Sequence, residues 1–143
     1  MSYPVTEGLY SPDHEIFRET FRRFLKTEAE PHLERWTEAH KIDPEFWIKA
    51  GEAGILAVDI PEEYGGPGGD FQHRLTIAEE LGYSLAGATI GTAIIGDGVS
   101  EIIYRGGTEE HRRKYLPLMA QGKLRGGLAI TEPESGSDVS SLK

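Results

Sequence analysis

A hydroxyl-rich stretch near the end of the chain has the residue types of an anion-binding turn. Residues 127–138 read Gly-Leu-Ala-Ile-Thr-Glu-Pro-Glu-Ser-Gly-Ser-Asp. Thr131 follows a short apolar run and offers a hydroxyl and a backbone N–H on one edge, and Pro133 then forces the chain to turn. The hydroxyls of Ser135 and Ser137, with nearby N–H groups, suit an anion such as a phosphate. Spacing alone favours equally a capping box that starts a helix at Ser135 or Ser137.

The other chemistry-bearing residues form weaker patterns. The chain has five histidines and no cysteine, and no histidine is paired with another ligand at zinc-site spacing, so we expect no metal site. Residues 65–69 are rich in glycine but lack the lysine and the strand-to-helix context of a phosphate loop, which favours a tight turn. Glu62 and Glu63 are adjacent acids on a loop, and we expect them to be solvated.

Composition bounds the class of protein. The chain has 143 residues with 38% hydrophobic and 27% charged residues, which is typical of a soluble globular domain. A formal net charge of −9 disfavours nucleic acid and anionic membranes as partners. The first ten residues do not resemble a signal peptide and residues 85–95 are too short to span a bilayer, so we expect a cytoplasmic location.

Helix signals precede the hydroxyl-rich stretch. Ser11-Pro12 and Asp43-Pro44 are helix starts, with Pro31 ending or bending the first helix and Gly54 closing the second. Further segments follow in chain order: a buried extended segment at 55–61, a loop at 62–70, a third helix at 71–85 and a fourth at 89–104.

The fourth predicted helix is apolar nearly all round, which is typical of a helix buried in the middle of a domain. Thr108 is expected to cap a fifth helix that Pro117 splits in two. After residue 123 the helical period stops, and 124–131 is predicted to be a strand. The sequence therefore predicts an all-α domain of about five or six helices, followed by one strand.

Residues 129–138 closely resemble the signature of the flavin-dependent acyl-CoA dehydrogenases. The resemblance covers the chain from about residue 11 to 143 and includes four upstream stretches: 50–56, 60–66, 79–82, and 106–110 with 114–117. The first helix and residues 68–70 look most like the long-chain type. The resemblance implies that residues 1–123 form the N-terminal α-helical domain of that fold. It implies that residues 124–143 begin the middle β-domain, which would be cut short here.

The resemblance also implies a binding site for FAD on the strand and its loop. Thr131 matches a threonine near the pyrimidine end of the flavin, where fixed donors stabilise the charge of the reduced ring. Leu128 matches a position whose backbone carbonyl meets the ring, and Ser137 matches a serine near the FAD phosphates and the coenzyme A part of the substrate. Ala129 and Ile130 complete the predicted cofactor-binding residues.

The implied reaction is oxidation of an acyl-CoA thioester to its 2,3-enoyl form in fatty acid β-oxidation. A carboxylate removes the α-proton while the β-hydride passes to flavin N5, and the family takes that base from a C-terminal helical domain, so no catalytic residue is expected in this chain. The fourth helix matches a wall of the acyl pocket, although core packing explains these residues equally well: Thr89, Ile90, Ala93 and Ile94.

Partners follow from the same resemblance. The parent is expected to be a homotetramer or homodimer that passes electrons to an electron-transfer flavoprotein. Residues 1–143 alone are expected not to turn over acyl-CoA and to bind FAD weakly or not at all. Two alternatives remain at this point: an acyl-CoA oxidase or flavin monooxygenase of the same fold, and a free-standing helical interaction module with little exposed apolar surface.

Overall fold

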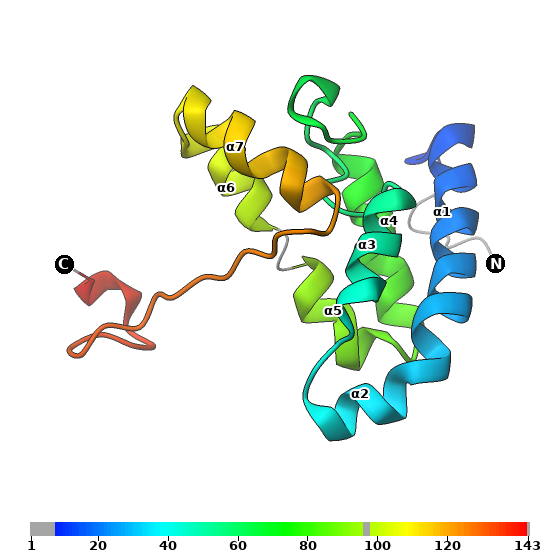
Figure 1. Ribbon diagram of the computed structural model, residues 1–143, viewed down its shortest axis with the longest axis horizontal. Coiled ribbons are helices and arrows are strands. Elements are labelled where there is room, and N and C mark those ends of the chain that lie inside the picture. The colour runs from blue at the N-terminus through cyan, green and yellow to red at the C-terminus, as the bar shows by residue number, and fades with distance from the viewer. Residues whose placement is uncertain (1–7, 96–97, 143) are drawn as a thin grey trace.

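The computed structural model describes residues 8–95 and 98–142, and it is helical, as predicted (Figure 1). The helices are α1 (Pro12–Phe24), α2 (Leu33–Ala39), α3 (Pro44–Glu52), α4 (Phe71–Tyr83), α5 (Gly87–Ile95), α6 (Gly98–Gly106) and α7 (Glu109–Ala120). Shorter turns are η2 (Leu25–Ala29), η3 (Glu30–His32), η4 (Glu62–Tyr64) and η5 (Val139–Ser141). Among the described residues, no helix is both long enough and apolar enough to cross a membrane.

The predicted helix starts are confirmed. Ser11 is the N-cap of α1, with Pro12 as its first residue, and the Ser11 hydroxyl accepts a hydrogen bond from the His14 N–H at 3.4 Å. Thr108 caps α7 in the same way, accepting from the His111 N–H at 3.2 Å. The first helix bends through η2 and η3 around Pro31, and the chain continues as α2. These signals are local, because a cap depends on residues within one turn.

The single fourth helix predicted over 89–104 is wrong, since the structure has two helices there, α5 and α6. Residues 96 and 97, between them, lie outside the described part. Glycine costs roughly 0.8–1 kcal/mol per interior helix position relative to alanine, so the glycines of this run weaken the case for one long helix. When a helix is apolar on every side, the sequence has no polar face whose shift would mark where one helix ends and the next begins.

Two further local predictions are corrected. Residues 55–61 are mostly buried, as expected, but they form turns rather than an extended segment, with Ala57 at φ 50° and the Ile60 N–H donating to the Ala57 carbonyl at 2.9 Å. A short apolar run does not by itself separate a strand from other buried structure. Pro117 does not split the fifth helix, because α7 runs continuously to Ala120. A proline removes one helical hydrogen bond, and the remaining bonds of α7 hold.

Helices α1 and α4 lie side by side and enclose the main core with α2, α3 and α5 (Figure 1). A buried ion-pair network joins the two helices. Arg18 on α1 and Glu80 on α4 are each 3% exposed, and the Arg18 Nη1 donates to the Glu80 carboxylate at 2.9 Å. Burial opposes the charge of Arg18, yet hydrogen bonds to Glu80 and Glu79 raise the pKa of its guanidinium above the ordinary value. A second, smaller core lies under α7, around Leu116.

The chain leaves the helices at a tight junction after α7. Gly122 has φ 68°, and a Cβ added there would lie 1.9 Å from the carbonyl oxygen of Trp47. Three residues later the Arg125 guanidinium stacks on the Trp47 ring, 3.7 Å from its centre. Glycine at 122 is therefore required both by its backbone angle and by the close approach of α3.

The strand predicted over 124–131 does not form. Figure 1 shows this segment extended and leading away from the helices, and it pairs with no other described segment. An extended chain becomes a strand only when a neighbour accepts and donates its backbone hydrogen bonds. The prediction was correct for the conformation and wrong for the pairing.

Candidate flavin loop and acyl pocket

The predicted cofactor-binding segment is exposed and has no hydrogen-bond partners within the described part of the chain. Leu128 and Ile130 are 63% and 53% exposed. No backbone group of residues 126–131 bonds to any described residue, and neither does the Thr131 hydroxyl. Backbone N–H and C=O groups are strong hydrogen-bonding groups that are nearly always paired when buried. This segment therefore presents donors and acceptors on both edges to a ligand or another chain segment.

The following turn is ordered by its own hydrogen bonds. The Glu132 N–H donates to the Ser135 carbonyl at 2.8 Å, and Ser135 is buried with its hydroxyl donating to the Asp138 carbonyl at 2.7 Å. The Asp138 carboxylate accepts from the side chain and N–H of Ser140, which lowers its pKa. Asp138, rather than Ser135 or Ser137, caps the short helix η5. The Ser137 hydroxyl is exposed and has no partner among the described residues.

These observations show what the loop offers chemically. Ser135 uses its hydroxyl to close the turn, so it is not available for an anion, whereas Thr131 and Ser137 remain available. An isoalloxazine ring needs fixed donors at its pyrimidine edge, and a pyrophosphate needs hydroxyl and N–H donors. The unpartnered groups on the loop fit both needs. A cofactor of that kind would supply redox chemistry that the side chains of this chain do not have.

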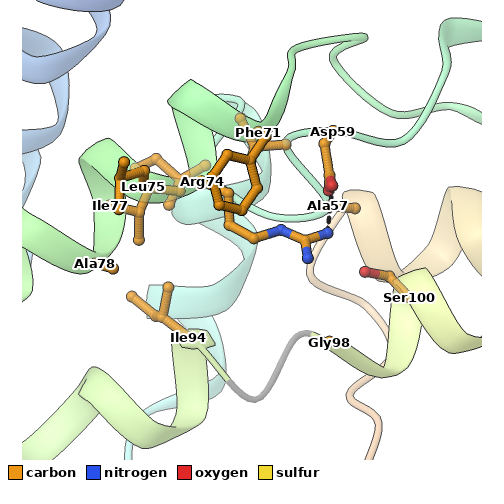
Figure 2. A pocket seen from close by; sticks show the side chains of 12 residues that line it. Ala57, Asp59, Phe71, Arg74, Leu75, Ile77, Ala78, Ile94, Gly98 and Ser100 are labelled. Atoms are coloured by element: carbon orange, nitrogen blue, oxygen red, sulfur yellow. Dashed lines mark hydrogen bonds and ion pairs between the residues drawn. The ribbon is translucent and has the colours of Figure 1, made fainter. Parts of the chain in front are cut away.

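A largely apolar pocket of about 170 Å³ lies between α4, α5 and α6 (Figure 2). Ile94, one of the predicted substrate-binding residues, points into it, and α4 contributes Leu75 and Ala78 from the opposite side. The remaining lining residues are Ile55, Ala57, Val58, Asp59, Phe71, Arg74, Ile77, Gly98 and Ser100. The pocket is smaller than the roughly 300–1,000 Å³ of typical ligand pockets, so by itself it holds only a short stretch of an apolar ligand.

The structure does not bring all predicted acyl-wall residues to this pocket. Ile90 is fully buried in the main core. Thr89 faces α2 instead, where its hydroxyl lies 3.2 Å from that of Thr37. Ala93 lies on α5, but its side chain is outside the described part. Ile94 is the one described side chain of the four that lines the pocket, and the acyl-wall role of all four residues stays a prediction.

Arg74 is a pocket residue that sequence reasoning missed. It forms ion pairs with Asp59 and Glu101, so it connects α4 to the 55–61 turn and to α6 at one side of the pocket (Figure 2). Hydrogen bonds to the two carboxylates raise the Arg74 pKa against the effect of burial, and the Arg74 bond lowers the pKa of Glu101. The three residues are far apart in sequence, and no local spacing pattern links them.

The family model and the curated relatives that match this chain belong to the same family. Residues 11–123 match the family model described as acyl-CoA dehydrogenase, N-terminal domain. The chain is 38% identical over 135 residues to the mitochondrial long-chain specific acyl-CoA dehydrogenase of Mus musculus, covering 94% of this chain and 31% of that protein. The chain thus spans about a third of the length of this curated relative.

Solved structures agree in fold. An acyl-CoA dehydrogenase from Bacillus anthracis, complexed with FAD, superposes with a TM-score of 0.79 at 38% identity, covering 94% of this chain and 23% of that chain. A structure described as an electron transferring flavoprotein of Acidaminococcus fermentans has a TM-score of 0.79 at 32% identity, covering 100% of this chain and 36% of that chain.

Proposed function

We propose that this chain, which belongs to the acyl-CoA dehydrogenase family through its N-terminal domain, forms the first part of a flavoenzyme that oxidises acyl-CoA thioesters to 2,3-enoyl-CoA. The observation that carries the proposal is the unpartnered 126–131 segment, ending in the available hydroxyl of Thr131. FAD, present in the Bacillus anthracis relative, would supply the hydride acceptor. We place the domain boundary at residue 123, with 124–143 beginning the middle β-domain.

In this proposal the chain binds and orients rather than reacts. The Thr131 hydroxyl and N–H donate to the flavin edge where negative charge gathers on reduction, and the Leu128 carbonyl accepts from the ring. The Ser137 hydroxyl donates to a phosphate. Ala129 and Ile130 lie between these contacts in the extended backbone. The base that removes the α-proton is proposed to lie outside residues 1–143.

The acyl chain is proposed to run along α5. Ile94 supplies apolar surface to it from the pocket wall. Thr89, Ile90 and Ala93 remain proposed contacts of the ligand once further protein surrounds α5. Electrons would leave the parent enzyme to an electron-transfer flavoprotein, and we propose a homotetrameric or homodimeric parent. Residues 1–143 alone are proposed to be inactive, because the loop and the pocket are both open to solvent on this chain.

The test compares flavin binding and reduction in the full-length protein that carries this sequence. Thr131→Val removes the hydroxyl at nearly constant volume, and Thr20→Val on α1 is the matched control, since the Thr20 hydroxyl bonds only to the Ile16 carbonyl at 3.0 Å. We expect the full-length protein to contain FAD that acyl-CoA bleaches under anaerobic conditions. Thr131→Val should lower FAD occupancy or make the bound flavin harder to reduce, and Thr20→Val should not.

The outcomes separate the proposal from its competitors. A full-length protein whose flavin is not reduced by any acyl-CoA would overturn the proposed reaction. Rapid reoxidation of the reduced flavin by oxygen would instead identify an oxidase of the same fold. Substrate-dependent bleaching by the 143-residue chain mixed with FAD would overturn the proposed inactivity of this chain.

A further inference from the structure

The apolar pocket between α4, α5 and α6 has one polar end. Figure 2 shows Ala78 and Ile94 on one side of it, whereas the guanidinium of Arg74 points to the other side, towards Asp59 and Ser100. An alkyl chain gains free energy when it is buried against hydrocarbon, and it gains none against groups that must keep their hydrogen bonds. The two ends of the pocket therefore treat an alkyl chain differently.

The ion pairs of Arg74 close the polar end, because they reach two neighbouring walls of the pocket. The Arg74 Nη2 donates to the Asp59 carboxylate in the 55–61 turn, and its Nη1 donates to the Glu101 carboxylate on α6. The other oxygen of Glu101 accepts from the Arg105 Nε at 2.7 Å, which fixes that carboxylate in turn. The guanidinium is thus held from both sides, and it cannot move aside without breaking charge-assisted hydrogen bonds.

An alkyl tail that reached this cluster would pay for it in lost hydration. The side chains of Arg74, Asp59 and Glu101 are 35%, 20% and 24% exposed, so water still reaches them. A hydrocarbon tail would displace that water and offer no hydrogen bond in exchange. Burial lowers the pKa of Arg74, but hydrogen bonds to the two carboxylates outweigh it and raise the pKa above the ordinary value, so the charge stays. The alkyl chain is therefore stable up to the ion pairs and not beyond them.

We propose that Arg74, fixed by Asp59 and Glu101, determines the length of acyl chain that this pocket accepts. The inference rests on the proposed function, because that function assigns the acyl chain to this pocket. The substrates are then acyl thioesters with an unsubstituted alkyl tail, whose terminal methyl group stops before the guanidinium. Arg74 acts on the end of the chain and takes no part in the reaction.

The chain-length profile of the full-length protein tests the proposal. Acyl-CoA thioesters of increasing chain length are compared by kcat/KM, measured with an artificial electron acceptor. Arg74→Ala removes the side chain beyond Cβ and opens the polar end. Arg105→Ala is the matched control, because Arg105 also bonds to Glu101 but its side chain is 75% exposed and does not line the pocket. Circular dichroism checks that each variant is folded, and Arg74→Ala combined with Asp59→Ala removes a charged pair together where the single change unfolds the protein.

We expect kcat/KM in the unchanged protein to rise with chain length to a maximum and then to fall by about tenfold or more for chains that are too long. Arg105→Ala should have its maximum at the same chain length. In Arg74→Ala the maximum should move to chains longer by about two carbon atoms or more, because the removed side chain leaves a cavity. The same chain-length profile in Arg74→Ala and in the unchanged protein would overturn the proposal.

A second measurement does not depend on the reaction. Calorimetry of straight-chain primary alcohols with the same proteins should show affinity rising by up to about fourfold per methylene group, and then no further rise beyond a length that Arg74→Ala extends. If no acyl-CoA reduces the flavin, the proposed function fails, and the alcohol series alone decides this inference. An affinity that does not rise with chain length in the unchanged protein, or a limiting length that Arg74→Ala leaves the same, would overturn it.

Discussion

Replacing Glu80 with glutamine should lower the free energy of unfolding far more than a glutamate-to-glutamine change on an exposed helix face. Both oxygens of the Glu80 carboxylate are used: Oε1 accepts from Arg18 and Arg22 at 2.9 Å, and Oε2 accepts from the Arg22 Nε at 2.6 Å. Glu80 and Arg18 are each 3% exposed. Glu80→Gln keeps the shape and removes the charge, so a buried guanidinium loses its closest compensating carboxylate.

The magnitude follows from what remains around Arg18. Removing one partner of a buried pair typically costs about 3–5 kcal/mol, because the other charge is left uncompensated. Here Glu79 still accepts from the same Arg18 nitrogen at 2.9 Å, and Glu15 accepts at 3.2 Å. We therefore expect a loss of about 2–3 kcal/mol, which is a large fraction of the roughly 5–15 kcal/mol that holds a domain folded.

Urea unfolding at pH 7, followed by circular dichroism, measures this loss. The matched control is Glu19→Gln, because Glu19 also bonds to Arg22, at 3.0 Å, but its side chain is 72% exposed. We expect the control to cost about 0–0.5 kcal/mol. The double change Arg18→Met with Glu80→Leu should cost less than Glu80→Gln alone. If Glu80→Gln and Glu19→Gln cost the same, the argument from burial is refuted.

Gly122→Ala should prevent the chain end from packing on Trp47 and lower the unfolding midpoint, because the added Cβ would lie 1.9 Å from a carbonyl oxygen at φ 68°; Gly127→Ala, with nothing within 4 Å, should leave the midpoint unchanged. The pKa of Glu101 is lowered by its bond to Arg74, so this pair stabilises the fold above the ordinary glutamate pKa and loses its effect as the pH falls through the lowered value. Glu101→Gln should thus destabilise the chain at pH 7 and progressively less towards pH 3, and a pH-independent difference in urea unfolding would contradict this.

Much of the fold was predictable because helix starts are local signals. Ser11 and Thr108 cap helices where the sequence indicates, since a hydroxyl and the N–H groups of the next turn decide the cap. The break between α5 and α6 was not predictable, because an apolar pattern all round gives no phase. The missing pairing of 124–131 was not predictable either, since a strand depends on a partner that the segment does not encode.

In the candidate site, too, local features were predictable from the sequence and tertiary ones were not. The resemblance of residues 129–138 located the loop, and the structure adds that Thr131 and Ser137 keep their hydroxyls available while Ser135 does not. The pocket depends on the approach of α4 to α5. Leu75 and Ala78 have the helical spacing of core residues, and only their tertiary position makes them pocket residues. A side chain's distant neighbours, rather than its own type, decide between packing and binding.

A small rotation of the backbone at the junction of Gly122 and Arg125 moves the far end of the extended segment by a much larger distance. Beyond Arg125, six residues of extended chain, 126–131, reach about 20 Å at roughly 3.3 Å per residue, so a rotation of about 10° at the junction displaces Thr131 by roughly 3–4 Å. The stacking of Arg125 on Trp47 sets the direction in which this extended segment leaves the helices. A substitution at Trp47 would therefore change the position of the Thr131 hydroxyl, which we propose to contact the flavin, without altering that hydroxyl itself.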